Sequence, residues 1–172
     1  MPNNETMINF RKCTTADIDL IRELTFKIWP ATYSAIIAPG QIEYMLDMMY
    51  SEAALKEQLH QKQHIFIILY HNDTPAGFAS YSVKEPGKIN GYKLHKIYVL
   101  PQKQGLGLGK KMVDFIIGDI IPHGAKTLEL NVNRSNKAKG FYESIGFSVI
   151  KEEDIDIGNG YFMNDFVMEK VL

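Results

Sequence analysis

The sequence has few of the features that mark secreted, zinc-binding or membrane proteins. Its 172 residues include one cysteine, Cys13, so the chain can form neither an internal disulfide nor a thiol-rich zinc site. No histidine lies near Cys13 in the sequence, and we expect this thiol to fill apolar space rather than to act as a nucleophile. No stretch approaches the ~20 apolar residues of a membrane span, and the N-terminus lacks the basic and apolar regions of an export signal. These absences predict a cytoplasmic protein with no membrane partner.

The sequence also lacks an excess of charge of either sign. It has 19 lysines and arginines against 20 aspartates and glutamates, a formal net charge of -1. Without a basic stripe, a nucleic-acid partner is not expected. The histidines have no spacing typical of a zinc site, so we expect no bound metal. With 45% hydrophobic residues and no repeat or linker, the chain can bury a full core, and we expect a single domain over residues 1–172.

A glycine-rich loop connects a predicted strand to a predicted helix. The strand at residues 92–100 ends before Pro101, and Gly105, Gly107 and Gly109 then alternate ahead of the helix. Without Cβ atoms, these positions let the backbone turn sharply and present several N–H groups to one anion, beside the positive end of the helix. The spacing fits neither a Walker A loop nor a dinucleotide fingerprint. Taken alone, the glycines favour a phosphate site and a plain strand-to-helix turn about equally.

The rest of the chain predicts an α+β fold. Helical spacing predicts four helices, and alternating apolar residues between turn signals predict seven strands. The predicted helices cover residues 14–29, where Pro30 stops or bends the helix, 41–61 with an interruption near Ser51, 110–120 and 136–144. The predicted strands cover residues 7–13, 64–71, 75–85, 92–100, 127–132, 147–156 and 161–171.

Two motifs in this order resemble the signatures of the GNAT superfamily of N-acetyltransferases. Residues 104–109, QGLGLG, resemble its [QR]-x-x-G-x-[GA] acyl-CoA loop, and residues 136–147, NKAKGFYESIGF, resemble its second signature. One helix and one strand separate them, as in the family. The resemblance covers most of residues 64–172. It implies a single-domain GNAT-like fold, with a mixed, twisted sheet of about seven strands flanked by about four helices and splayed open between the fourth and fifth strands.

The resemblance implies that acetyl-CoA is the acyl donor. The backbone of the fourth strand would pair with the pantetheine arm as if it were another strand, and the glycine loop would hold the pyrophosphate. Asn136 would contact the cofactor arm, although Asn is also a good helix N-cap. The implied cofactor-binding residues are Ile97, Tyr98, Val99, Gln104, Gly105, Leu106, Gly107, Leu108, Gly109, Lys110, Asn136 and Lys139.

Amide formation from a thioester needs a base and an acid, because the amine attacks only after losing a proton and the thiolate leaves more readily when protonated. The resemblance assigns the acid to Tyr142, whose alternative role is to pack beside Phe141. Many GNAT proteins place a glutamate base where this chain has His95. An imidazole with a pKa near neutrality is a competent base. His95 is therefore our predicted base, and a plain surface histidine on a strand is the equal alternative.

Aromatic residues in the first two helices predict an acceptor site for a cationic amine. Trp29, Tyr33 and Tyr44 could wall such a site together with Glu43 and Asp47, or the aromatic and methionine side chains could simply form core. The C-terminal segment YFMNDFVMEKVL is similar to that of PaiA-type spermidine/spermine N-acetyltransferases.

The predicted function is therefore direct acetyl transfer to a primary amine, a polyamine or another small amine, without a covalent enzyme intermediate. A noncatalytic acyl-CoA sensor and a protein N-acetyltransferase stay open as alternatives. GNAT proteins are often dimers, and the strand at 161–171 offers an edge for homodimer pairing.

Overall fold

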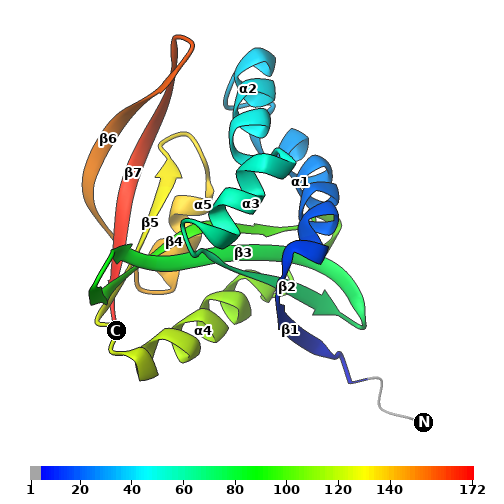
Figure 1. Cartoon of the computed structure of the whole chain (residues 1–172), viewed down its shortest axis with the longest axis vertical. Helices are drawn as coiled ribbons and strands as arrows, with labels where there is room; N and C mark the ends of the chain where they lie inside the picture. Colours follow the sequence, from blue (N-terminus) through cyan, green and yellow to red (C-terminus); the bar gives the residue numbers. More distant parts are fainter. Residues whose placement is uncertain (1–4) are drawn as a thin grey trace.

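The computed structural model describes residues 5–172, which contain a seven-stranded, strongly twisted mixed sheet (Figure 1). The strands lie in the order β1-β2-β3-β4-β5-β7-β6. All six pairs of neighbouring strands are antiparallel except β4 with β5. The strands are β1 (Ile8–Lys12), β2 (Ile65–His71), β3 (Thr74–Glu85), β4 (Lys88–Val99), β5 (Thr127–Asn133), β6 (Ser148–Gly158) and β7 (Tyr161–Val171). The α+β class and the seven strands predicted from the sequence are confirmed.

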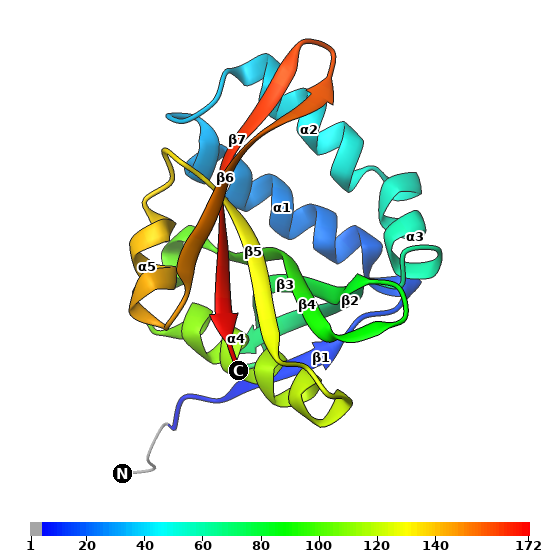
Figure 2. The ribbon, with the colours of Figure 1, turned by 90° about the vertical axis from the view of Figure 1, so that its left-hand side faces the viewer.

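Five α-helices cover the two faces of the sheet (Figure 2). The helices are α1 (Ile18–Tyr33), α2 (Pro39–Tyr50), α3 (Glu52–His60), α4 (Leu108–Ile120) and α5 (Ala138–Ser144). Helices α1 to α3 enclose one hydrophobic core with β2 and β3, and α4 and α5 enclose a second core on the opposite face. None of the helices described within residues 5–172 has the length and apolar character required to cross a bilayer.

The helix boundaries show where the sequence patterns hold. The predicted interruption near Ser51 is a break between α2 and α3, and the Ser51 hydroxyl accepts a hydrogen bond from the Ala54 N–H as an N-cap. The helix count is therefore five rather than about four. Of the two effects predicted for Pro30, a stop or a bend, the stop is not found, because α1 continues to Tyr33. Pro30 lies on the exposed side, where water can satisfy the carbonyl that a proline leaves unpaired.

The sheet splits between its two parallel strands. β4 pairs with β5 only over Gly91–Leu94, opposite Thr127–Leu130, and the two strands then diverge. A β-bulge lies at this point, since Ser80 of β3 faces Lys96 while Tyr81 faces Leu94. His95 is the extra residue of the bulge. The predicted opening between the fourth and fifth strands is present, and the last residues of β4 form one of its edges.

The β6–β7 hairpin contacts helix α2, whose first turns it crosses in the view of Figure 2. The Tyr44 hydroxyl donates to the Ile157 carbonyl over 2.6 Å, and the Gln41 side-chain amide donates to the Phe162 carbonyl over 2.7 Å. The hairpin turns through Gly158, Asn159 and Gly160, which all have positive φ. The two contacts connect the hairpin to the helical layer across the opening in the sheet.

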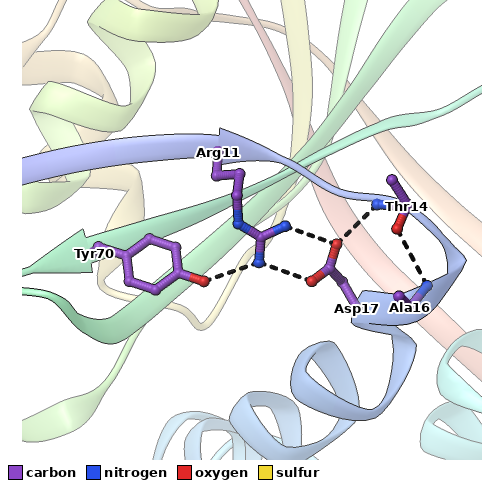
Figure 3. Close-up of polar contacts among 5 residues, drawn as sticks. All are labelled: Arg11, Thr14, Ala16, Asp17 and Tyr70. Carbon is purple, nitrogen blue, oxygen red and sulfur yellow. Dashed lines mark hydrogen bonds and ion pairs between the residues drawn. The ribbon is translucent and has the colours of Figure 1, made fainter.

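An ion pair between an exposed arginine and a buried aspartate holds the start of α1 against the sheet (Figure 3). The Arg11 guanidinium donates to both carboxylate oxygens of Asp17, over 3.0 and 2.8 Å, and to the Tyr70 hydroxyl over 2.9 Å. Asp17 also accepts from the Thr14 N–H over 2.8 Å. The hydrogen bonds from Arg11 are the main cause of a lowered pKa for Asp17. This network joins β1 and β2 to α1, the helix that carries Trp29 and Tyr33.

Candidate active site

A cavity of about 1140 Å³ occupies the opening between β4 and β5. Helices α1 and α2 line one end, and the glycine loop with α4 and α5 lines the other. Small-molecule sites usually measure about 300–1,000 Å³, so this cavity can hold two ligands or one long one. Most of the predicted cofactor and acceptor residues therefore line one space.

The loop end is built to receive an anion. Gly105 and Gly107 have φ values of 81° and 75°, which side chains rarely adopt, and Gly107 caps helix α4. The N–H groups of the first turn of α4 have no partner within the helix and lie at the positive end of its dipole. Most of the predicted loop residues line the cavity: Gln104, Gly105, Gly107, Leu108, Gly109 and Lys110. Leu106 does not line it, and its side chain is 54% exposed.

The open edge of β4 lies beside this loop. Ile97, Tyr98 and Val99 line the cavity and have no pairing with β5. The Gln104 side-chain amide donates to the Val99 carbonyl over 3.2 Å and so ties the loop to the strand end. A strand edge with unpaired backbone groups can bind an extended ligand by strand addition.

Helix α5 brings Tyr142 to the same cavity. Its ring packs against Phe147 with centroids 5.8 Å apart, and no side chain within residues 5–172 forms a hydrogen bond to its hydroxyl. Burial raises the pKa of Tyr142 well above its ordinary value, so the phenol stays protonated. Tyr142 therefore packs against Phe147, and its protonated phenol lies on the wall of the cavity.

Asn136 and Lys139, the other residues predicted in this segment, differ in whether they line the cavity. Asn136 lines the cavity, and its side-chain oxygen accepts from the Ala138 N–H over 2.9 Å, as a local cap would. Lys139 does not line the cavity, contrary to prediction, because it forms an ion pair with Glu143 over 3.2 Å. Lys137, which the sequence analysis did not single out, lines the cavity instead. Helix α5 is too short for its facing side to be read from periodicity.

Aromatic rings line the opposite end. Trp29 and Tyr33 of α1 lie with ring centroids 4.5 Å apart, and the Tyr33 and Tyr98 hydroxyls are 2.9 Å apart. Tyr50 of α2 meets Trp29 edge to face. The prediction for Tyr44 is not matched by the geometry, because its side chain binds the β6–β7 hairpin and does not line the cavity. The face that α2 turns to the hairpin could not be read from the sequence.

His95 lies in the bulge with its ring held on both sides. Its Nε2 is 2.7 Å from the Ser82 hydroxyl, and its ring stacks on His64 with centroids 3.9 Å apart. Burial, followed by the neighbouring His64 and Lys96, lowers the pKa of His95 to about 2. The near-neutral pKa expected from the sequence is therefore not found, and the surface alternative is not found either. His95 is a neutral, partly buried imidazole in the wall of the cavity.

Lys96 is a buried cation that sequence reasoning missed. It is 8% exposed, lines the cavity and donates to the Gln58 side-chain oxygen over 2.7 Å. Its ammonium lies 5.3 Å from the centre of the Tyr50 ring. Burial lowers the pKa of Lys96 to about 7. Simple alternation would place Lys96 on the same face as Leu94, and only the bulge at His95 turns it towards the α1–α3 layer.

A buried carboxylate was also missed. Asp165 of β7 lines the cavity and is 3% exposed. It accepts one hydrogen bond from the Asn131 amide over 3.2 Å, and burial raises its pKa. The available signal was an aspartate between the apolar residues of a predicted strand. No group of three or more histidine, cysteine or acidic side chains within residues 5–172 could hold a metal ion.

Comparison with known proteins identifies the architecture. The family model described as an acetyltransferase (GNAT) domain matches residues 34–168. The chain belongs to the GNAT family. As a GNAT protein it is an acetyl-CoA-dependent N-acetyltransferase, with acetyl-CoA as its co-substrate.

Three relatives show how far the similarity extends. A spermidine N(1)-acetyltransferase from Thermoplasma acidophilum is 26% identical over 168 residues, 95% of this chain and 96% of that protein. The crystal structure of the PaiA N-acetyltransferase from Thermoplasma acidophilum in complex with coenzyme A matches 96% of this chain and 99% of that chain, with 25% identity and a TM-score of 0.80. A [ribosomal protein bS18]-alanine N-acetyltransferase from Haemophilus influenzae is 38% identical over 69 residues, which span 40% of this chain and only 44% of that protein.

Proposed function

We propose that this GNAT protein transfers the acetyl group of acetyl-CoA directly to the primary amine of a small molecule, with polyamines as the first class to test. The observation that carries the proposal is the shape of the acceptor end. Trp29 and Tyr33 wall it, and the β6–β7 hairpin is bound to α2 across it through Tyr44. Aromatic faces attract an ammonium group, and a covered cavity favours a small acceptor over a folded protein. The similarity to a spermidine N(1)-acetyltransferase supports the same class.

The donor would lie along the glycine loop and β4. We assign its pyrophosphate to the loop of Gln104–Lys110 and the start of α4, and its pantetheine arm to the open edge at Ile97–Val99. Asn136 faces the same space. The thioester would then lie where β4 and β5 diverge, next to the ring of Tyr142. Leu106 and Lys139 are not included, because neither lines the cavity.

The transfer needs one base, which takes a proton from the amine, and one acid, which gives a proton to the thiolate. The free amine attacks the thioester carbonyl carbon, the C–N bond forms, and the C–S bond breaks. The nitrogen also loses one proton, which restores the acid after that acid has protonated the thiolate. Tyr142 gives its proton to the departing thiolate, a role supported by a phenol that stays protonated and has no other described partner. His95 faces the same space, as a base must, but a pKa of about 2 leaves it little affinity for a proton at neutral pH. We infer that His95 shapes the wall with Ser82 and His64.

We also propose that residues 1–172 act as one domain in the cytoplasm. The free thiol of Cys13 suits a reducing compartment. The strand at 161–171 offers no free edge, contrary to prediction, because β7 pairs with both β5 and β6. A homodimer would instead use β6, the outer strand, which carries the exposed Val149 and Ile150. Size-exclusion chromatography with light scattering tests that assembly.

The function is tested by thiol release from acetyl-CoA over a panel of acceptors, with the acetylated product identified by mass spectrometry. The panel holds spermidine, spermine, a monoamine, amino acids, aminoglycosides, a lysine peptide and a peptide with an N-terminal alanine. Turnover of small amines, with kcat/KM at least about tenfold above the peptides, supports the proposal. Preference for either peptide would make the chain a protein acetyltransferase. Tight acetyl-CoA binding without turnover of any acceptor would favour the sensor alternative.

A further inference from the structure

Asp165 is a buried carboxylate with an incomplete set of partners. Ionised side chains are rarely this buried unless they are paired. Asp165 receives the Asn131 amide on Oδ2, and its other oxygen accepts no hydrogen bond from residues 5–172. Arg134 is nearby, but it donates to the Asp165 backbone carbonyl and forms its ion pairs with Glu152 and Asp154. The carboxylate charge therefore has no cation of its own within the described part of the chain.

Asn131 adds a second unused acceptor at the same place. Its side-chain oxygen is buried and has no hydrogen-bond partner in residues 5–172. β5 and β7 pair in this region, and both Asn131 and Asp165 line the cavity. Leaving a buried acceptor unpaired costs about 1–3 kcal/mol. The two side chains together present acceptors and negative charge, the complement of an ammonium group with its three N–H donors.

This pair faces the acceptor end of the cavity. Asp165 is close enough to Tyr33 for its charge to raise the pKa of that phenol, although burial is the larger cause. Tyr33 in turn contributes to the raised pKa of Tyr142, after burial. The Tyr33 hydroxyl also bonds to Tyr98, which lies on the β4 edge. Tyr33, Asp165 and Tyr142 all line the same cavity.

We propose that Asp165 and Asn131 bind the ammonium group of the acceptor, and that Asp165 accepts the proton which this nitrogen loses before it attacks acetyl-CoA. This inference rests on the proposed function. The N–H bond breaks and its proton moves to the carboxylate. The freed lone pair forms the C–N bond, the C–S bond breaks, and Tyr142 protonates the thiolate. The proton on Asp165 leaves to water, and the acylated nitrogen then gives its second proton, through Asp165, to the Tyr142 phenolate. The amide is then neutral, both side chains are back in their starting states, and the cycle closes without a further reactant.

Asp165→Asn tests the inference, because it keeps the size of the side chain and removes its charge and basicity. With a polyamine acceptor, we expect kcat/KM to fall about 10²-fold or more, while the Kd for acetyl-CoA, measured by calorimetry, stays within about twofold. Asp156→Asn is the matched control. Asp156 is exposed on β6 and accepts from the Gly158 N–H, a bond that asparagine can keep. The control should retain full activity.

The pH profile separates a base from a structural residue. Four groups influence the carboxylate: Lys93 of β4 and Arg134 after β5 favour its ionised form, Glu153 of β6 disfavours it, and Asn131 stabilises it by hydrogen bonding. A base must be ionised, so kcat/KM should fall at low pH in the wild type, and this acid limb should disappear in Asp165→Asn. Asn131→Ala removes the donor to Asp165, and its acid limb should move to higher pH.

The outcomes distinguish the two proposals. If no small amine reacts with the wild type while acetyl-CoA binds, the proposed function fails. If the wild type acetylates a small amine but Asp165→Asn reacts within about threefold of it with the same acid limb, only the inference on Asp165 is overturned. If Asp165→Asn does not fold, as judged by circular dichroism, Asn131→Ala decides the matter, and an unshifted acid limb would contradict the inference.

Discussion

The hydroxyl groups of Tyr33 and Tyr98 lie 2.9 Å apart and form a hydrogen bond between helix α1 and strand β4. Burial raises the pKa of both phenols, so both remain protonated at neutral pH. α1 carries the aromatic wall of the acceptor end, and the Tyr98 backbone belongs to the open edge of β4. This hydrogen bond therefore connects the acceptor end of the candidate active site to the open edge of β4.

The first prediction concerns this contact. Tyr33→Phe leaves the Tyr98 hydroxyl without its partner, and we expect the free energy of unfolding to fall by about 1–3 kcal/mol. Tyr98→Phe should have a similar effect, and the double variant should be less destabilised than the sum of the two. Urea unfolding of the four proteins measures the coupling. Strictly additive losses would show that the two hydroxyls do not stabilise one another.

The second prediction concerns the acid. Tyr142→Phe keeps the ring that packs on Phe147 and removes only the hydroxyl. We expect kcat to fall about 10²-fold, with little change in KM for acetyl-CoA, because the phenol contributes in the transition state. Steady-state rates over a range of acetyl-CoA concentrations provide the measurement. A rise in KM with kcat unchanged would make Tyr142 a binding residue instead.

The third prediction concerns Lys96 and the stability of the fold. Its pKa is about 7 in the folded protein, chiefly through burial, and about 10.4 in an unfolded chain. Between these values the unfolded chain binds more protons, so the free energy of unfolding should rise with pH. The cost of the buried charge is fully present below about pH 7 and disappears towards about pH 10. Lys96→Met removes this titration.

Urea unfolding at several pH values between about 7 and 9 gives the free energy of unfolding of the wild type and of Lys96→Met. The wild type should gain stability across this range, and Lys96→Met should gain clearly less. Glu52→Gln is a useful control, because Glu52 is exposed and its pKa is lowered, mainly by Lys56, so its titration lies far below this range. Parallel curves for the wild type and Lys96→Met would contradict a lowered pKa for Lys96.

Local motifs carried much of the site prediction. The glycine loop is readable because its conformation depends on a few adjacent residues, and Gly105 and Gly107 do adopt positive φ. The segment from Asn136 to Tyr142 is similarly local. These residues predicted the fold, which is confirmed, and they led to the donor end that we propose.

The acceptor end depends on long-range features that the sequence does not display. Lys96 faces the cavity because one extra residue, His95, shifts the alternation of β4. Asp165 gains its role only when β5 and β7 pair and bring Asn131 beside it. Tyr44 was assigned to the acceptor because its helix is rich in aromatic residues, but its partner lies in a hairpin more than a hundred positions away in the sequence. Periodicity cannot encode such contacts.

The most direct test of the account is an initial-rate study in which acetyl-CoA and the preferred small amine are both varied. Direct attack requires both substrates in the cavity together, and the candidate nucleophile Cys13 does not line it and has a pKa raised to about 12 by burial. We therefore predict double-reciprocal lines that intersect. Parallel lines, with an acetylated enzyme detected by mass spectrometry, would indicate a covalent intermediate and contradict the account.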